Sequence, residues 1–224
     1  MNTIRKLITA VLASAGLAVT SYAGAVLEIW TDNVSATFVY DNASGDSNGN
    51  IGSINWNGTV DGWDISVVGG KTVFGGTSPA VDLVALVTSS GNGGTLRMFY
   101  GDNNFGPTSN ASVIGTIGGT TNGGNGTSVF FGAGFNDQNI SEWGAWNGTT
   151  TVGGNPFWGG FNESLADSTL YSLQVQVEVT HRGAATTSFD AYVGVPDTAS
   201  TALLISLGLM GVGVAARRNR RAQV

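Results

Sequence analysis

The chain has 224 residues and a formal net charge of −6, with no cysteine and a single histidine, His181. The absence of cysteine excludes thiol catalysis, iron–sulfur clusters and cysteine-ligated zinc, and one histidine leaves little for a multi-histidine metal centre or a serine–histidine–aspartate triad. Residues 26–195 hold three basic and fourteen acidic residues, a net charge of −11, which disfavours binding to nucleic acid because phosphate backbones are repelled.

The first segment, residues 1–25, has the composition of a secretory signal peptide. Arg5 and Lys6 precede an apolar run over 7–19, and the small residues Ala23 and Ala25 form an A-x-A-like cleavage site. An amphipathic first helix of a domain would need a polar face, which this run lacks. The sequence therefore predicts a signal peptide that a signal peptidase removes on export.

Three segments follow one another at the other end of the chain. Val195, Pro196 and Asp197 open a stretch of small and turn-forming residues, and an apolar stretch over 199–216 comes next. A helix of about 18 residues spans about 27 Å, close to the ~30 Å hydrocarbon core of a bilayer, so this stretch predicts a transmembrane helix. The arginines behind it would stay on the cytoplasmic side, and they are Arg217, Arg218, Arg220 and Arg221.

This order of motif, apolar segment and arginine cluster over 195–224 resembles the PEP-CTERM sorting signal, with Val-Pro-Asp where the family has Pro-Glu-Pro. The resemblance implies recognition by an exosortase-like processing enzyme, cleavage near Pro196, and display at the cell surface or release. Contact with the inner membrane would be transient, because the hydrophobic tail is removed as in a GPI signal.

The segment between the two ends, residues 26–194, predicts one all-β domain. Asn-Gly pairs, which favour turns with positive φ, separate short β-prone runs, and no stretch shows a sustained helical period. Residues 118–126, nearly without side chains, predict a loop. The β-prone runs predict an antiparallel β-sandwich, jelly-roll-like, and they cover residues 26–30, 36–40, 51–56, 63–68, 83–88, 96–100, 112–117, 128–131, 173–179 and 187–193.

Two of these runs alternate between apolar and polar residues. In 173–179, four apolar residues share one face while Gln174, Gln176 and Glu178 share the other, which predicts a half-buried strand with a polar side toward solvent. The run 187–193 alternates too. The short link between the two runs, through His181, predicts a hairpin with the histidine solvated in its turn.

Part of this domain resembles a β-rich module of exported PEP-CTERM proteins. The resemblance is carried by Gly-Trp-Asp-Ile-Ser-Val over 62–67, Val-Asp-Leu over 81–83 and Gly-Asp-Asn-Asn-Phe-Gly-Pro over 101–107. It implies a β fold and no particular chemistry.

Oxygen-bearing residues over 41–50 raise the prospect of a structural calcium ion. Asp46, Asn48 and Asn50 alternate as the ligands of a calcium loop do. Glycine is missing at the sixth position and an acid at the twelfth, which excludes an EF-hand. An Asx-rich turn explains the same residues, so calcium as the one cofactor and no cofactor at all both stay open.

The six tryptophans of a chain with few charges raise the prospect of carbohydrate binding. Trp143, Trp146 and Trp158 cluster in one Gly- and Asn-rich segment. Aromatic faces on a β-sandwich stack on sugar rings, and nearby Asn and Asp bond the hydroxyls. The same rings would also serve as core residues.

The sequence favours an exported structural or adhesive protein of the cell envelope or of a polysaccharide matrix. A lectin-like carbohydrate-binding module is the alternative, and a glycan-active enzyme is the third interpretation. A non-enzymatic role is expected, because no nucleophile elbow, P-loop or dinucleotide fingerprint occurs in the sequence. A structural role predicts buried rings and no cleft, a binding module predicts exposed rings, and an enzyme predicts paired acids in a groove.

Overall fold

The computed structural model describes residues 24–73, 79–106, 111–122, 126–136, 148–164, 167 and 170–196. These residues form strands and turns without a helix, which confirms the predicted all-β class. The strands are β1 (Val26–Thr31), β2 (Thr37–Tyr40), β3 (Ser53–Val60), β4 (Trp63–Val73), β5 (Ala80–Ser89), β6 (Gly94–Phe105), β7 (Ser112–Thr121), β8 (Ser128–Asn136), β9 (Gly148–Val152), β10 (Phe157–Ser164), β11 (Tyr171–His181) and β12 (Ala185–Gly194).

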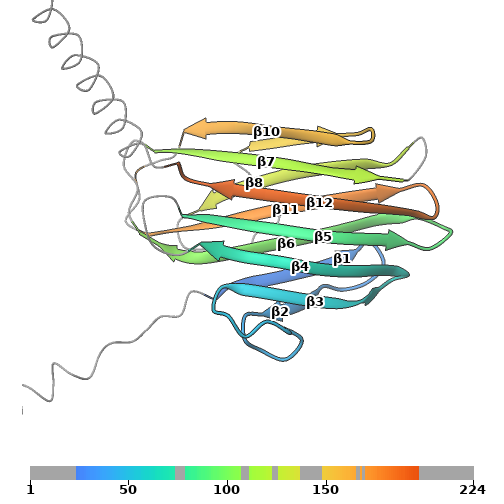
Figure 1. The fold of residues 1–224 in the computed structure, drawn as a ribbon, viewed down its shortest axis with the longest axis horizontal. Helices are drawn as coiled ribbons and strands as arrows, with labels where there is room; N and C mark the ends of the chain where they lie inside the picture. Colours follow the sequence, from blue (N-terminus) through green and yellow to red (C-terminus); the bar gives the residue numbers. More distant parts are fainter. Residues whose placement is uncertain are drawn as a thin grey trace, which may run out of the picture.

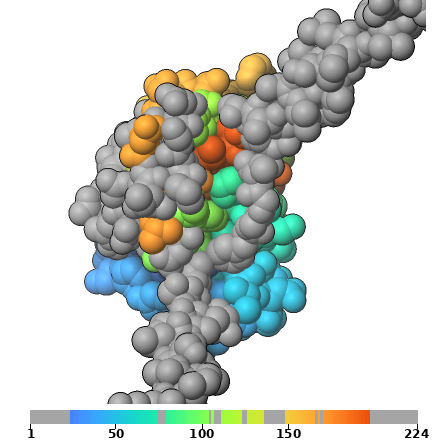
Figure 2. Space-filling model, turned by 90° about the vertical axis from the view of Figure 1, so that its left-hand side faces the viewer, coloured from blue at the N-terminus to red at the C-terminus, as the bar shows by residue number. Residues whose placement is uncertain are grey.

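The strands form two antiparallel sheets that lie face to face (Figure 1). The first sheet has the order β2-β1-β6-β11-β8-β9, and the second sheet has the order β10-β7-β12-β5-β4-β3. Figure 2 views this sandwich from one end, with the blue and cyan residues of the first strands at the bottom and orange residues of β10 at the top. The antiparallel two-sheet sandwich predicted from the sequence is therefore confirmed.

The core lies between the sheets and follows from period-two alternation. Leu173, Val175, Val177 and Val179 of β11 are fully buried, and alternate residues of β12 meet them from the other sheet, since successive side chains of a strand point to opposite faces. One continuous apolar cluster contains buried residues of every strand except β9. Val152 of β9 is partly buried and packs against this cluster. Burial of this apolar surface is the main force that holds the two sheets together.

All ten strands predicted from the sequence are present, and the sequence analysis missed two. The missed strands are β9 and β10, which lie at neighbouring edges of the two sheets. The predicted loop over 118–126 is wrong in its first part, because residues 118–121 belong to β7 and pair with β10 and β12. All four residues pair with β12, and Gly118 and Gly119 pair with β10 as well, so backbone pairing makes them a strand although they carry few side chains.

The predicted hairpin between the last two strands is wrong. β11 lies in the first sheet and β12 in the second, so the link over 182–184 crosses the sandwich. Both strands alternate. An alternating strand can bury its apolar face either as a neighbour of the preceding strand in one sheet or in the opposite sheet across the core. The sequence pattern therefore does not distinguish a hairpin from a crossing of this kind.

The polar side of β11 also differs from expectation. Gln174 and Gln176 are fully buried, whereas the alternation predicted exposure to solvent. Phe99 of the neighbouring β6 is 1% exposed, and its ring extends toward Gly101, where a Cβ would lie 2.9 Å from Phe99 Cζ and 3.3 Å from Gln174 Cβ. An aromatic ring packed into the space left by a glycine helps to cover this part of the outer face.

Candidate functional site

The outer face of the second sheet carries an open groove of about 1140 Å³. It crosses β4, β5, β12, β7 and β10, the strands in the front layer of Figure 1. Apolar side chains and glycines form most of its surface, and polar groups are interspersed among them. The side chains that define it are Val68, Val84, Leu86, Trp158, Ser66, Thr116, Ser188 and Asp190.

Trp158 is the most exposed large apolar side chain among the described residues, at 84%. It lies on the edge strand β10, directly opposite Gly118 of β7. If the indole packed over Gly118 to stabilise the fold, most of its surface would be buried by that contact. At 84% exposure the ring leaves its surface to solvent, which is unfavourable for the isolated chain and typical of a binding site.

Gly118 leaves the floor of the groove open beside this ring. A Cβ built at this position would have only Phe157 O near it, at 3.9 Å. Gly118 does not have the positive φ that would require glycine, so the fold would accept a side chain here. The hollow beside Trp158 therefore results from the missing side chain at Gly118, and the backbone conformation does not require glycine there.

Polar groups face the opposite side of this hollow. Asp190 of β12 is directly opposite Gly118 and is exposed, and Ser188 and Thr116 also line the groove. An apolar ring beside a few hydroxyl and carboxylate oxygens suits a sugar, whose faces carry C–H groups and whose edge carries hydroxyls. Leu86 and Val68, which are 46% and 63% exposed, extend the apolar surface across β5 and β4.

Two carboxyl groups lie together beside the groove. Asp82 of β5 pairs in register with Tyr192, two residues along β12 from Asp190, so the two acids occupy diagonal positions on one face. Burial and the repulsion of Asp190 raise the pKa of Asp82 to about 7, and Lys71 acts in the opposite direction. Oδ1 of Asp82 is buried and has no hydrogen-bond partner.

The side chains of Asp46 and Asn48, predicted to bind calcium, accept hydrogen bonds from backbone N–H groups of their own loop and the strand that follows it. Oδ1 of Asp46 accepts the backbone N–H groups of Asn48 and Asn55, at 2.8 and 3.0 Å, and its Oδ2 accepts that of Asn42 at 3.0 Å. Oδ1 of Asn48 accepts the N–H of Asn50 at 3.0 Å. The bonds from Asn48 to Asp46 and from Asn50 to Asn48 form Asx turns. The described residues contain no cluster of three or more acidic or histidine side chains fit to hold a metal.

The predicted sorting motif, Val195 to Asp197, begins directly after β12. Val195 is 6% exposed, and its N–H donates to Pro79 O at 3.0 Å. Pro196 follows at the limit of the described residues, and Asp197 and the arginines at 217, 218, 220 and 221 lie outside them. The predicted signal helix and the apolar helix over 199–216 lie outside as well, and within the described part of the chain no helix is long and apolar enough to cross a membrane.

Of the three predicted sugar-stacking residues, the structure places Trp158 in the groove, while Trp143 and Trp146 lie outside the described residues. The sequence analysis missed Gly118, because it fell in the predicted loop. It also missed the pairing of Asp82 with Asp190. The alternation of β12 carried a signal for Asp190, since it predicts an outward side chain there.

The prediction of a solvated His181 is wrong. The ring is 2% exposed, stacks on Trp63 at a centroid distance of 4.7 Å, and lies 2.8 Å from Ser89 Oγ through Nδ1 and 2.8 Å from Thr187 Oγ1 through Nε2. Burial lowers its pKa to about 4. A neutral ring between two buried hydroxyls, away from the groove, makes this serine–histidine contact part of the core.

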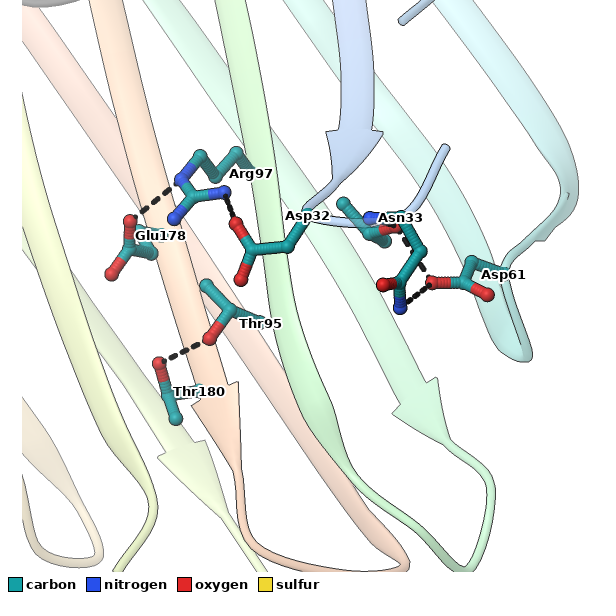
Figure 3. A network of polar contacts seen from close by, with 8 residues as sticks. Asp32, Asn33, Asp61, Thr95, Arg97, Glu178 and Thr180 are labelled. Atoms are coloured by element: carbon teal, nitrogen blue, oxygen red, sulfur yellow. Dashed lines mark hydrogen bonds and ion pairs between the residues drawn. The ribbon is translucent and has the colours of Figure 1, made fainter. Parts of the chain in front are cut away.

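The outer face of the first sheet carries ion pairs (Figure 3). Nε of Arg97 donates to Glu178 Oε2 at 2.8 Å, and Nη1 of the same guanidinium donates to Asp32. Nearby, the hydroxyls of Thr95 and Thr180 lie 3.2 Å apart. Arg97, Glu178 and Asp32 therefore each face an opposite charge.

Comparisons with known proteins give similarity in structure alone. No protein-family model and no curated protein matches the sequence. Among solved structures, the chain is similar to TmCBM61 in complex with beta-1,4-galactotriose, with 11% identity, a TM-score of 0.34, and coverage of 60% of this chain and 88% of that one.

Two further solved structures show the same level of similarity. The CBM22-1 xylan-binding domain of Paenibacillus barcinonensis Xyn10C has 13% identity and a TM-score of 0.30, covering 70% of this chain and 91% of that one. The enzymatically active domain of bacteriophage CBA120 tailspike protein 4 has 9% identity and a TM-score of 0.37, covering 70% and 21%. Similarity at this level leaves the function to be inferred from the residues of the chain itself.

Proposed function

We propose that the chain is an exported cell-surface protein whose jelly-roll-like sandwich binds extracellular polysaccharide as a lectin-like module. The observation that carries the proposal is Trp158, an indole 84% exposed at the edge of a groove. The hollow at Gly118 gives a sugar ring room to stack on the indole, and Asp190 and Ser188 supply acceptors for its hydroxyls. An exposed ring in a groove is the arrangement that distinguishes a binding module from a purely structural sandwich.

Binding is favoured over hydrolysis by the number of acids in the groove. Glycosidases hold two carboxyl groups about 5–10 Å apart, so that the sugar or a water fits between them. Asp190 is the one acid among the described residues that line the groove, so the groove has no second carboxyl group on the other side of the sugar. Asp190 contributes acceptors and charge to the groove.

The test of this function is a titration with neutral oligosaccharides. Binding next to Trp158 is expected to change the tryptophan fluorescence of the purified domain, and Trp158→Ala is expected to weaken binding at least about tenfold, since stacking and burial of an indole contribute about 1–3 kcal/mol. The thermal midpoint of Trp158→Ala should stay within about 2 °C, because an exposed side chain contributes little to folding.

Tyr40→Ala is the matched control for this titration. Tyr40 is also an exposed aromatic residue near a sheet edge, at 55% exposure, but it lies on β2 of the first sheet, away from the groove. Its replacement should leave binding unchanged. Equal losses in both variants, or no binding to any glycan of a broad panel, would exclude the groove as a sugar site.

Export and sorting are part of the same proposal and rest on the sequence patterns at both ends. Removal of 1–25 by a signal peptidase and cleavage near Pro196 by an exosortase-like enzyme would leave a domain that starts with β1 and ends with β12. The intact mass of the protein recovered from medium and membranes measures both cleavages. A mass that retains residues 197–224, found in membranes alone, would contradict the sorting part and leave the binding part standing.

A further inference from the structure

Three residues lie in one row across the groove. Trp158, Gly118 and Asp190 are direct partners on β10, β7 and β12. Because neighbouring strands lie about 4.8 Å apart, the backbones at Trp158 and Asp190 are separated by about 10 Å, with no side chain between them. A sugar stacked on the indole therefore presents one edge to the carboxyl group of Asp190.

That carboxyl group lies beside a second acid, because the charge of Asp190 helps to raise the pKa of Asp82. Oδ1 of Asp82 is buried and has no hydrogen-bond partner. The other charged or titratable groups that act on the pair are Lys71 of β4 and Tyr192 of β12. One cation beside two acids leaves this site with an excess negative charge when both acids are ionised.

From this geometry, and resting on the proposed function, we infer that the groove selects a polysaccharide of amino sugars with free ammonium groups. An ammonium at the sugar edge places N–H donors at the carboxyl group of Asp190, which lines the groove. It also supplies the positive charge that the pair lacks.

The charge of the rest of the chain points in the same direction. Residues 26–195 carry a net charge of −11, which repels uronic acid polymers at long range and attracts cationic ones. An N-acetylated sugar of the same linkage retains the ring for stacking but loses the charge. The groove should therefore rank an ammonium-bearing glycan first, its N-acetylated form second and a uronic acid polymer last.

The experiment is calorimetric titration of the purified domain with a hexamer of β-1,4-linked glucosamine, its fully N-acetylated form and a hexamer of galacturonic acid, at pH 6.5. The glucosamine hexamer should bind about tenfold more tightly than the N-acetylated one, a ratio expected from one charge-assisted contact. Asp190→Asn should reduce this preference to about threefold or less. Between pH 5 and 6.5 the affinity of the wild type for the glucosamine hexamer should rise about tenfold as the ionised fraction of Asp82, whose pKa is raised to about 7, increases, and Asp190→Asn should remove most of this rise.

Two variants separate a built site from general attraction to an acidic protein. Asp64→Asn removes an exposed acid of the same face that does not line the groove, and it should leave the preference intact. Trp158→Ala should weaken binding of both uncharged and charged hexamers. If it leaves the glucosamine hexamer bound as before, the attraction is general and the inference is overturned.

The failure of this inference is distinguishable from that of the proposed function. Equal affinity for the glucosamine and N-acetylated hexamers, both sensitive to Trp158→Ala, would overturn the selection of amino sugars and support a neutral-glycan site. No binding of any oligosaccharide would overturn both.

Discussion

The outer faces of the two sheets differ in the pairing of their charges and in the filling of the space above their glycines. On the first sheet, Arg97 faces Glu178 and Asp32, and Phe99 fills the space above Gly101. On the second sheet, the space above Gly118 is empty, Trp158 is exposed, and Asp82 and Asp190 face one another with like charge. A face with matched charges and filled spaces stabilises the fold, whereas a face with unmatched charges and an open hollow is available to a ligand.

The largest effect is expected from His181, which lies in the core and not on either outer face. Its protonation limits the pH range in which the folded protein is stable enough for the two faces to be compared. Its pKa is about 4 in the folded protein against about 6.5 when unfolded. The unfolded state binds the proton first, so the stabilisation is complete above about pH 6.5 and is lost as pH falls toward 4, by roughly 3 kcal/mol. The difference between the wild type and His181→Gln in urea unfolding at pH 7.0 and 4.5 measures this loss.

His181→Gln is the control for the pH dependence. It retains polar contacts to Ser89 and Thr187 without a titrating ring, so its unfolding free energy should be lower at pH 7 but should fall less toward acid. Asp82 and Asp102, whose pKa values are raised to about 7 and about 6, act with the opposite sign in both proteins. If the two proteins lose stability equally between pH 7.0 and 4.5, the buried neutral histidine is not the cause.

The next effect compares the same substitution on both faces. Gly101→Val forces a side chain against Phe99 Cζ at 2.9 Å and should lower the unfolding free energy by about 1–3 kcal/mol. Gly118→Val has no atom within 3.9 Å of its Cβ and should fold with about wild-type stability. It should instead fill the hollow beside Trp158 and weaken glycan binding.

Urea unfolding and calorimetric titration of both variants decide this comparison. Gly49→Val, at a loop position where a Cβ has no atom within 4 Å, controls for the effect of an added side chain elsewhere. A destabilised Gly118→Val, or a stable one that binds as the wild type does, would contradict an open hollow used for binding.

The smallest effect is expected from Arg97. Arg97→Met leaves Glu178 and Asp32 without their cation, and because the guanidinium is 21% exposed, the loss should be about 1 kcal/mol and smaller at high salt. Glycan binding should not change. Lys71→Met, on the other face, is the matched control, and its effect should appear in the pH dependence of binding more than in stability. A larger loss of stability from Lys71 than from Arg97 would reverse the comparison.

Most of the sandwich was predictable because its strands bury one face. The ten predicted strands contain β-prone runs between turn signals, and two of these runs, 173–179 and 187–193, show the alternation that is the main sequence signal of a half-buried strand. β9 and β10 gave no such signal, since a single residue of each, Gly148 and Phe157, is buried. Their position comes from backbone pairing with β8 and β7, which depends on the fold as a whole.

The candidate site was predictable as a residue type but not as an arrangement. Trp158 was predicted as one of three clustered aromatic residues, whereas β10, the strand that carries it, was not predicted. Asp82 and Asp190 meet because β5 and β12 are neighbours in one sheet, and strand order cannot be read from period-two alternation. Gly118 lacks a side chain, which gave it the pattern of a loop although it lies within a central part of the sheet.

The position of β12 has a mechanical consequence. β12 is hydrogen-bonded along its length to β5 on one side and β7 on the other, and the chain leaves it at Val195, which is still tied to Pro79. In a protein held through this end while the groove holds a polymer, tension runs along β12. Antiparallel hydrogen bonds lie perpendicular to their strands, so both ladders share the load in shear and must yield together before the strand is pulled out.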